Sequence, residues 1–186
     1  MGALIYAAIA SLDGYVADAA GGFAWARPAA DVHAAVNDME RPIGTYLYGR
    51  RMYEVLSAWE DSDDWAGDDP ITLDYAAIWR SADKVVWSTT LVAPTTARTR
   101  LERSFDPAAV AALKAGSDRD LSIGGPHLAA QALRAGLVDV LALFLVPVVV
   151  GGGTRALPDD CRLDLSLAGT RTFADGTVLL RYDAAP

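Results

Sequence analysis

The feature that most constrains the fold of this chain is a run of 34 residues, Leu121 to Thr154, in which apolar segments alternate with glycine-rich turns. Leu121 to Ile123 is a short apolar run, and Gly124-Gly125 and Pro126 follow it. The fixed φ of proline suits the first turn of a helix, so the pattern predicts a strand that runs directly into a helix from His127 to Ala135.

The second half of this run predicts another strand. Gly136 is suited to end the helix, and Leu137 to Val146 is apolar apart from Asp139. Such a continuous apolar segment is typical of a strand that is covered on both faces, and Pro147 marks its limit. A strand, a helix and a second buried strand in immediate succession predict an α/β fold.

The Gly124-Gly125 dipeptide allows two interpretations. Glycines at a strand–helix junction let the backbone approach a ligand closely, and the free N–H groups at the start of the helix favour a phosphate. The same dipeptide is also common in tight turns that bind nothing. The junction lacks the full G-x-G-x-x-G fingerprint, and the chain contains no G-x-x-x-x-G-K-[ST] loop, so a P-loop nucleotide hydrolase is not supported.

Length and composition predict one soluble domain that spans residues 1–186. Although 52% of the residues are hydrophobic, no run approaches the roughly 18 apolar residues that would cross a bilayer. The apolar N-terminus lacks the basic region of a signal peptide, and Cys161, the single cysteine, cannot form an internal disulfide. We therefore expect a cytoplasmic protein with no membrane partner.

The charge of the chain argues against nucleic acid as a partner. Its formal net charge is -8 and its pI is about 4.6, whereas a nucleic-acid-binding domain presents a basic face. The acidic run from Glu60 to Asp69 is interpreted as a solvated loop, because it lacks the spacing of a calcium loop. His33, His127 and Cys161 do not make a zinc constellation, so no metal is expected.

Leu4 to Ala10 is predicted as the first strand, and the loop from Ser11 to Ala17 follows it with a turn at Asp13-Gly14. Ligands of open α/β sheets bind at the carboxyl ends of the strands. Asp13 and Tyr15 are therefore placed to contact a ligand. A plain Asp-Gly turn explains the same residues equally well.

A helix is predicted to begin at Pro28, because Val32, Val36 and Met39 recur at helical spacing. Asp31 lies in its first turn, near the inward face. Its carboxylate either compensates the helix dipole or projects into a pocket beside the end of the first strand.

Two further predicted strands, Ile43 to Tyr48 and Asp83 to Trp87, end in residues that suit a phosphate ligand. The first is followed by a glycine and two arginines, and the second by three hydroxyl side chains. Arginine forks match phosphate oxygens, although exposed arginines are also common on any surface. The residues concerned are Gly49, Arg50, Arg51, Ser88, Thr89 and Thr90.

The rest of the chain supplies elements that complete a mixed, mostly parallel sheet flanked by helices. These elements are a helix over Pro70 to Arg80, a strand over Leu101 to Phe105, a helix from Pro107 to Gly116 capped by Asp106, an alternating segment over Leu163 to Leu167, and an antiparallel hairpin of Arg171 to Ala174 and Thr177 to Tyr182.

The order and spacing of these junctions resemble the dihydrofolate-reductase-like fold, and more closely the reductase domain of riboflavin biosynthesis, the RibD C-terminal domain, and the stand-alone proteins grouped with it. The resemblance covers essentially the whole chain. The segments that carry it are Ser11-Leu12-Asp13-Gly14-Tyr15, Gly49-Arg50-Arg51-Met52-Tyr53-Glu54, Ser88-Thr89, Ile123-Gly124-Gly125, Pro147 to Thr154 and Phe173-Ala174-Asp175-Gly176. It implies a single-domain α/β dihydrofolate-reductase-like fold with NADPH as cofactor.

The resemblance also implies roles for individual residues. Those that would hold the adenosine 2′-phosphate and pyrophosphate of NADPH are Gly49, Arg50, Arg51, Ser88 and Thr89, with Met52 grouped among the cofactor residues. Those on the other face of the pyrophosphate would be Gly124, Gly125, Pro126, His127 and Leu128. Ala7 and Ala8 would lie under the nicotinamide, which leaves the substrate to a pocket between Asp13, Tyr15, Asp31 and Thr154.

Two positions depart from the family pattern. The riboflavin enzymes commonly carry Lys after the Asp-Gly of the first loop, where this chain has Tyr15, which disfavours a phosphorylated ribose in the substrate. Pro126 stands where a basic residue or a third glycine often follows the diglycine, and it removes one N–H donor. The acid of folate reductases lies on the first helix, within a residue of the place of Asp31.

Two classes of function are consistent with these features. The first is an NADPH-dependent reductase that transfers hydride to a small pterin-, pyrimidine- or related heterocycle, or to a carbonyl or imine. The arginines at positions 50 and 51 would make NADPH preferred to NADH. The alternative is a non-catalytic protein that binds a dinucleotide or another small ligand. Hydride chemistry belongs to the cofactor, so the lack of an evident proton donor weighs little against an enzyme.

Asp31 and Asp13 are the candidates for proton delivery, and Asp31 comes first because the first turn of its helix faces the expected pocket. We expect burial to raise the pKa of such a carboxyl toward useful proton exchange.

We also expect a symmetric homodimer. The nearly continuous apolar segment from Leu137 to Val150 exceeds what a small monomer easily covers, and riboflavin-type relatives are commonly dimers.

Overall fold

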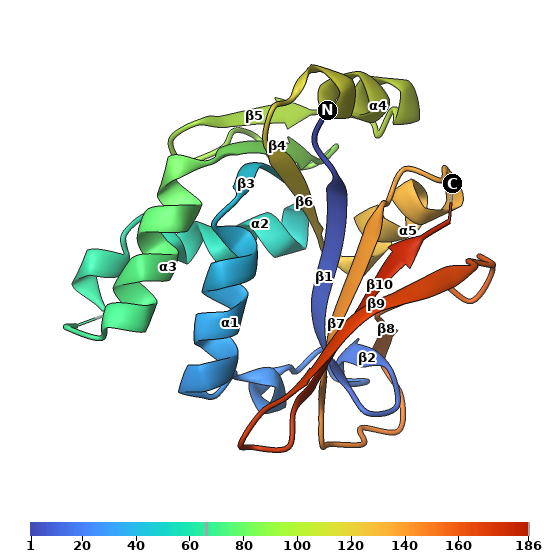
Figure 1. Cartoon of the computed structure of the whole chain (residues 1–186). Coiled ribbons are helices and arrows are strands. Elements are labelled where there is room, and N and C mark those ends of the chain that lie inside the picture. Colours follow the sequence, from blue (N-terminus) through green and yellow to red (C-terminus); the bar gives the residue numbers. More distant parts are fainter. Residues whose placement is uncertain (66, 186) are drawn as a thin grey trace.

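Eight strands form one mixed sheet with the spatial order β5-β4-β3-β6-β1-β7-β10-β9 (Figure 1). The structure, a computed structural model, describes residues 1–65 and 67–185. The strands are β1 (Leu4–Ser11), β3 (Ile43–Gly49), β4 (Asp83–Trp87), β5 (Thr99–Glu102), β6 (Asp120–Gly124), β7 (Val140–Val146), β9 (Leu165–Thr172) and β10 (Val178–Ala184). Neighbouring strands from β5 to β7 are parallel, and β10 runs antiparallel to β7 and to β9. The predicted mostly parallel sheet with a C-terminal hairpin is confirmed.

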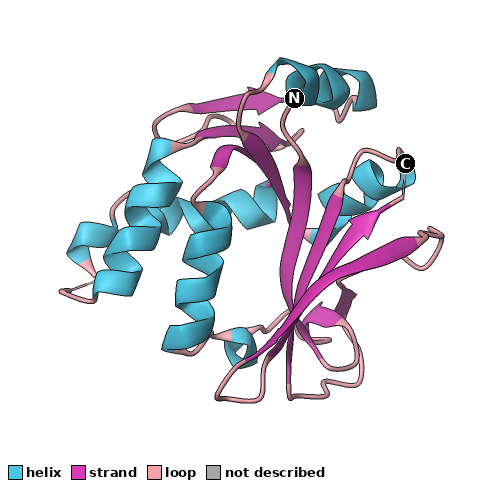
Figure 2. Ribbon diagram, viewed as in Figure 1, coloured by secondary structure: helices cyan, strands magenta, loops and turns pink. Residues whose placement is uncertain are grey.

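Helices cover both faces of the central strands, as Figure 2 shows. One face carries α1 (Ala30–Glu40), α2 (Arg50–Leu56) and α3 (Pro70–Ser81), and the other carries α4 (Pro107–Gly116) and α5 (Pro126–Arg134). Short 3₁₀ turns lie at η1 (Ala24–Ala26), η2 (Ser57–Trp59) and η3 (Ser62–Asp64). The last of these falls in the acidic run predicted as a loop, of which residue 66 lies outside the described residues.

Alternation along the buried strands explains why the core has two layers. Leu4 and Tyr6 of β1 pack with α4 and α5, whereas Ile5 between them belongs to the cluster on the opposite face. Leu47 and Tyr48 of β3 divide in the same way. Because successive side chains of a strand point to opposite faces, a strand buried on both sides has to be apolar at nearly every position.

Two helices begin with a capping aspartate followed by proline. The Asp106 carboxylate accepts a hydrogen bond from the N–H of Ala108 at 2.9 Å, and Pro107 is the first residue of α4. Asp69 accepts a hydrogen bond from the N–H of Thr72 at 3.1 Å and caps α3 in the same way. These carboxylates satisfy N–H groups that no helical carbonyl can reach, which is why the predicted helix start at Pro107 is confirmed.

Two predicted element starts are wrong by a few residues. α1 begins two residues after Pro28, because Ala29 is extended and serves as the N-cap. β7 begins three residues after Leu137. Just before β7, the Asp139 carboxylate accepts a hydrogen bond from the backbone N–H of Leu4 at 2.6 Å. In a regular parallel pair, a backbone carbonyl would accept this hydrogen bond.

Two other predicted strands also have different bounds. The strand expected over Leu101 to Phe105 is β5, which ends at Glu102 because the following residues leave the sheet and Phe105 packs against the ring of Trp87, with centroids 5.6 Å apart. The segments expected over Leu163 to Leu167 and Arg171 to Ala174 are parts of one strand, β9, which is paired with β10 along its length.

A second, two-stranded sheet was not predicted. β2 (Tyr15–Ala17) pairs antiparallel with β8 (Thr154–Arg155), although the first segment was expected to be a loop. Strands of two or three residues carry too little alternation to be recognised in a sequence. This small sheet joins the loop after β1 to the segment after the triple glycine.

Candidate active site

The carboxyl ends of the parallel strands form one edge of the main sheet, here called the ligand edge. Its strand ends are Ser11 of β1, Gly49 of β3, Trp87 of β4, Gly124 of β6 and Val146 of β7. The turn between β9 and β10 reaches the same edge, since β9 runs parallel to β7 with β10 between them. At the bottom of Figure 1 the ends of β1 and β7 gather with this turn and with β2.

A gap opens between β1 and β6 before the ligand edge is reached. β1 pairs with β6 only from Leu4 to Tyr6, but it pairs with β7 from Ile5 to Ser11. Beyond the shorter pairing, the side of β1 that faces β6 has no strand partner, because β6 turns into α5 at Gly124. Ala7 and Ala8 lie in this open stretch and are partly exposed. Both residues have small side chains.

Packing at Gly124 and the backbone conformation at Gly125 both favour glycine in this turn. A Cβ at Gly124 would lie 2.9 Å from Cε1 of Tyr48 and 3.2 Å from Cγ of Met52. Gly125 has a φ of 90° and is the N-cap of α5. The glycines are therefore explained whether or not this turn binds a ligand. Met52, predicted as a cofactor residue, packs against the turn.

The first turn of α5 offers backbone donors beside the gap. Pro126 has no N–H, and the N–H of Ala129 donates to the carbonyl of Gly125 at 3.0 Å. The N–H groups of His127 and Leu128 therefore have no helical acceptor. The side chain of His127 is exposed, whereas that of Leu128 is 5% exposed and lies in the core. Leu128 thus has only its backbone to offer a ligand.

The two arginines after β3 have different surroundings. Arg50 donates from Nε to Glu54 at 2.6 Å and from Nη1 to the Thr90 hydroxyl at 2.7 Å. Arg51 is exposed and has no hydrogen-bond or ion-pair partner among the described residues. Arg51 is consequently the arginine that is free to meet an anion at this end of the ligand edge.

The hydroxyl loop after β4 is held together by its own hydrogen bonds. The buried Ser88 hydroxyl accepts the N–H of Leu91 at 2.9 Å and that of Thr90 at 3.2 Å, while Thr89 is exposed. Arg103, which sequence reasoning missed, donates to the carbonyls of Leu91 and Ser88 at 2.7 and 3.1 Å. Arg103 lies just after β5, where its partners could be identified only from the strand order.

Asp13 ties the first loop to the segment after β7. Its Oδ2 accepts the N–H of Gly151 at 2.8 Å and its Oδ1 accepts that of Val150 at 3.2 Å. The Ser11 hydroxyl and these two N–H groups lower the pKa of the Asp13 carboxyl, which is only partly exposed. This direction is opposite to the expected rise, because hydrogen bonds to the charged form outweigh desolvation at this site.

Tyr15 and Thr154, both predicted to contact substrate, lie on the paired strands β2 and β8. The guanidinium of Arg155 lies over the Tyr15 ring, 5.3 Å from its centroid. Gly153 has a φ of 135°, and a Cβ there would lie 2.0 Å from the carbonyl oxygen of Ala17. The last residue of the triple glycine therefore permits the close approach of these two strands.

Asp31 lies in the first turn of α1 and is half-buried. Its Oδ1 accepts the N–H of Val32 at 2.9 Å, and its Oδ2 accepts the N–H of Ala174 in the β9–β10 turn at 3.2 Å. Phe173 of the same turn packs against the ring of Phe144, with centroids 6.1 Å apart. Asp31 is thus at the ligand edge, where it joins the first helix to the C-terminal hairpin.

A buried carboxyl lies away from the ligand edge, at the end of α1. Glu40 is 6% exposed and accepts a long hydrogen bond from the Ser122 hydroxyl at 3.5 Å. Burial raises its pKa to about 7, and the hydrogen bond from Ser122 acts in the opposite direction. Sequence reasoning missed this group, because a helix-terminal Glu is usually solvated.

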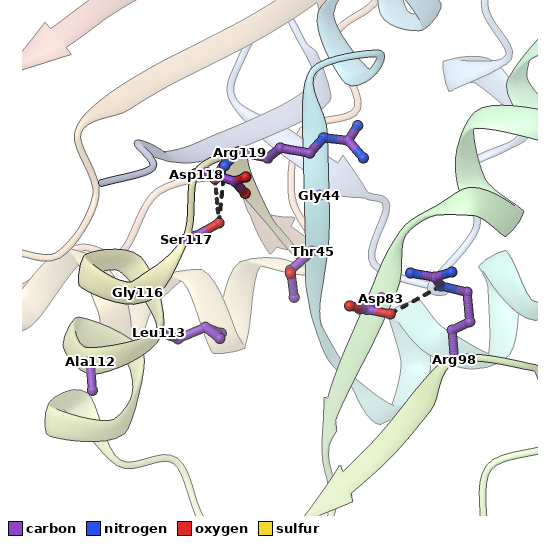
Figure 3. A pocket seen from close by; sticks show the side chains of 10 residues that line it. All are labelled: Gly44, Thr45, Asp83, Arg98, Ala112, Leu113, Gly116, Ser117, Asp118 and Arg119. Carbon is purple, nitrogen blue, oxygen red and sulfur yellow. Dashed lines mark hydrogen bonds and ion pairs between the residues drawn. The ribbon is translucent and has the colours of Figure 1, made fainter.

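A cleft of about 380 Å³ lies at the opposite edge of the sheet (Figure 3). It is lined by the amino-terminal ends of β3 and β4 and by the end of α4. Its arginines already have partners: Arg98 donates to Asp83 at 3.0 Å, and Arg119 donates to the carbonyl of Arg41 at 3.0 Å. None of the predicted site residues lines this cleft.

Comparison with known proteins supports the same fold. The family described as the RibD C-terminal domain matches residues 3–179. The uncharacterized protein YyaP of Bacillus subtilis is 27% identical over 187 residues, which cover 92% of this chain and 89% of that protein. In the described part of the chain, no helix is long and apolar enough to cross a membrane.

Two solved structures extend the comparison. A protein of Shewanella sp. PV-4 assigned to riboflavin biosynthesis is 19% identical with a TM-score of 0.77, and the match covers 99% of each chain. A dihydrofolate reductase from Enterococcus faecalis, complexed with NADP(H), is 14% identical with a TM-score of 0.65, over 100% of this chain and 98% of that one. The predicted dihydrofolate-reductase-like α/β fold is confirmed.

Proposed function

The chain belongs to the RibD C-terminal domain family, and on that premise we propose that it is an NADPH-dependent reductase acting on a small heterocyclic, carbonyl or imine substrate. The observation that carries the proposal is the gap beside β1, where Ala7 and Ala8 lack a strand partner on the side at which β6 turns into α5. Ligands of open α/β sheets bind at this edge. A neighbour of the same fold is complexed with NADP(H).

The residues around the gap fit a dinucleotide. The free N–H groups at the start of α5 suit a pyrophosphate, and within residues 1–65 and 67–185 Arg51 has no hydrogen-bond or ion-pair partner that would compete for an anion. The exposed Thr89 lies on the loop that follows β4, the neighbour of β3. When bound, NADPH would supply the hydride, while the protein positions the nicotinamide and the substrate.

Selectivity for NADPH would come chiefly from Arg51. Arg50 is already engaged by Glu54 and Thr90. Calorimetric titration should show NADPH binding at least about tenfold more tightly than NADH, because a hydrogen bond to a charged group contributes roughly 1.5–3 kcal/mol. Arg51→Ala should remove this preference without weakening NADH binding.

Arg162→Ala is the matched control, since Arg162 is an exposed arginine paired with Asp164 in the segment before β9. It changes the net charge equally and should leave both affinities unaltered. Equal affinities of the wild-type protein for the two dinucleotides, or no binding of either, would show that the cofactor assignment is incorrect.

The substrate would occupy the pocket between Asp13, Tyr15, Asp31 and Thr154. Asp31 is our first candidate to orient the substrate and assist its protonation, because it lies in the first turn of α1 at the ligand edge. Asp31→Asn should lower kcat/KM on an acceptor found by screening, with NADPH affinity unchanged. Unchanged kcat/KM would mean that water or the substrate itself supplies the proton.

A non-catalytic dinucleotide- or ligand-binding protein is the alternative. Turnover separates the two: a reductase oxidises NADPH in the presence of an acceptor, which is followed by the loss of nicotinamide absorbance. Binding of NADPH with no turnover across carbonyl, imine, pterin and pyrimidine acceptors would favour the alternative. The proposed organisation is a single domain over residues 1–186 that acts in the cytoplasm as a homodimer.

A further inference from the structure

A recess of about 190 Å³ lies between the last residues of α1 and the sheet. Figure 1 shows α1 beginning beside the ligand edge, where Asp31 lies, and running toward the opposite edge. None of the residues predicted to bind cofactor or substrate lines the recess. The apolar part of its lining consists of Ile5, Met39, Pro42, Ala142 and Leu179. The recess is therefore separate from the proposed cofactor and substrate sites.

The strand register explains why the sheet is hollowed at this place. Arg181 of β10 is opposite Ala142 of β7 on one side and Gly169 of β9 on the other. Residues directly opposite each other point to the same face of a sheet, so the Arg181 side chain stands between two positions that have almost no side chain. In the next row Leu179 is opposite Phe144, and both belong to the cluster beneath α1. The sheet surface is thus lower at Arg181 than one row further along.

The charges around the recess are not equally available to a ligand. Arg181 is exposed, and within residues 1–65 and 67–185 it has no hydrogen-bond or ion-pair partner. Both carboxylates of the lining have partners. Asp120 accepts a hydrogen bond from the N–H of Ala3 at 2.9 Å. Asp38 forms an ion pair with Arg41 at 3.6 Å. An unpaired cation therefore stands beside an apolar floor.

The larger cleft of about 380 Å³ at the opposite edge of the sheet lacks this combination. Its arginines, Arg98 and Arg119, each donate to an acceptor at 3.0 Å. Figure 3 shows the contact between Arg98 and Asp83. Of these two hollows, only the recess at the end of α1 offers a guanidinium without a partner in the described parts of the chain.

We propose that the recess binds a small monocarboxylate whose apolar body is about the size of one ring. The guanidinium of Arg181 presents paired N–H donors that match the two oxygens of a carboxylate. An apolar cavity of about 150 Å³ holds benzene, so a recess of about 190 Å³ has room for a ring. Asp38 and Asp120 repel a second negative charge, which restricts the ligand to one carboxylate.

The position of the recess suits an effector, because no candidate for proton delivery lines it. A ligand there contacts α1 and β10 together. Asp31 joins α1 to the turn before β10 at the ligand edge, through the N–H of Ala174. The ligand would therefore hold the same helix against the same hairpin at the other end of the helix.

The test is titration of the full wild-type chain with benzoate, followed by the amide chemical shifts in NMR spectra. Benzoate should shift the amides of the residues that line the recess. Benzamide has the same shape without the charge and should bind at least about tenfold more weakly, because a hydrogen bond between charged groups is lost. Acetate has the charge without the ring and should also bind at least about tenfold more weakly.

Arg181→Gln should weaken benzoate binding at least about tenfold and leave benzamide binding unchanged. The matched control is Arg171→Gln. Arg171 is opposite Leu179, so it lies on the same face one row away, but it does not line the recess. This control should leave the affinity for benzoate unchanged.

Three results would overturn the proposal: no binding of benzoate or shifts confined to the ligand edge, equal affinities for benzoate and benzamide, or equal weakening by the two arginine variants. Circular dichroism shows whether each variant is folded, and the comparison of the three probes on the wild-type protein needs no variant. None of these measurements requires NADPH, so a failure of the reductase assignment leaves this test unaffected.

Discussion

The two halves of the ligand edge are built in different ways. On the half proposed for the cofactor, over β5, β4, β3 and β6, the loops are held by contacts between neighbouring strands, as when Arg103 donates to the carbonyls of Ser88 and Leu91. On the half proposed for the substrate, over β1, β7 and the C-terminal hairpin, two carboxylates hold segments that are far apart in the chain. Asp13 reaches residues 137 and 138 positions away, and Asp31 reaches a residue 143 positions away.

This difference indicates that cofactor binding and substrate binding at such a site can change independently. A cofactor half made of short strand–turn–helix junctions depends on local backbone geometry, which tolerates little variation. A substrate half assembled from distant loops can be altered by changing one loop at a time. The loops of the second half could therefore vary while the first half is kept.

The largest expected effect is on stability, and it is tested by two separate glycine-to-alanine variants, one in each half. In Gly153→Ala the new Cβ would lie 2.0 Å from a backbone oxygen of Ala17, at a φ of 135°, so the β2–β8 pairing has to break. We expect the free energy of unfolding to fall by more than about 3 kcal/mol. In Gly124→Ala the Cβ would lie 2.9 Å from a side-chain atom of Tyr48 rather than from backbone, so the cost should be smaller, about 1–3 kcal/mol.

Urea denaturation measures both changes. Gly152→Ala is the control, because a Cβ there would meet nothing within 4 Å. If Gly152→Ala destabilises as much as Gly153→Ala, the close approach of β2 and β8 is not what requires the third glycine.

The next effect is a pH dependence of stability from the buried carboxyl of Glu40. Folded protein keeps this proton up to a pH of about 7, whereas the unfolded chain releases it near 4.5. Between these values the folded state binds more protons, so the free energy of unfolding falls as the pH rises, by up to roughly 3 kcal/mol at 1.36 kcal/mol per pH unit. Glu40→Gln should abolish this fall and be the more stable protein at pH 8.

The partly exposed carboxyl of Asp13 provides a contrast with Glu40, because its pKa is displaced in the opposite direction. Its contribution to stability is present above the unfolded pKa of 3.8 and is lost as the pH falls through the lower folded value. We therefore expect the urea midpoint of the wild-type protein to decrease as the pH rises toward neutral. Replacing Glu40 should remove this decrease, whereas replacing Asp13 should not. A wild-type protein whose stability rises between pH 5 and pH 7 would contradict the raised pKa of Glu40.

The smallest expected effect is on substrate binding alone. Asp13→Ala removes the acceptor for the N–H groups of Val150 and Gly151, so the segment after β7 should loosen. We expect KM for the acceptor to rise severalfold, with NADPH affinity unchanged because the cofactor half shares none of these bonds. Asp13→Asn keeps one acceptor oxygen, so its KM should lie between those of the wild-type protein and Asp13→Ala. A parallel loss of NADPH affinity would show that the two halves are not independent.

Local backbone physics explains what could be predicted from the sequence. Asp106-Pro107 predicts the start of a helix, and Gly124-Gly125-Pro126 predicts a strand–helix junction. Both predictions succeed because helix capping and a positive φ depend only on a few neighbouring residues. The order of such junctions was enough to identify the fold and the family. The parallel strands then brought most of the predicted cofactor residues to one edge, since the carboxyl ends of parallel strands share that edge.

The sequence by itself thus determined the α/β class, the strand–helix junctions and the edge at which a ligand should bind. Only the tertiary structure decided what the carboxylates do: Asp13 holds Gly151, Asp31 holds Ala174, and neither partner is foreseeable from residues more than 130 positions away. The tertiary structure also decided which residues of β9 and β10 lie on the same face. The register between these two strands shifts between Arg181 and Tyr182, and this shift cannot be read from the sequence. Local signals depend on neighbours in the chain, whereas these contacts depend on which distant segments fold to the same place.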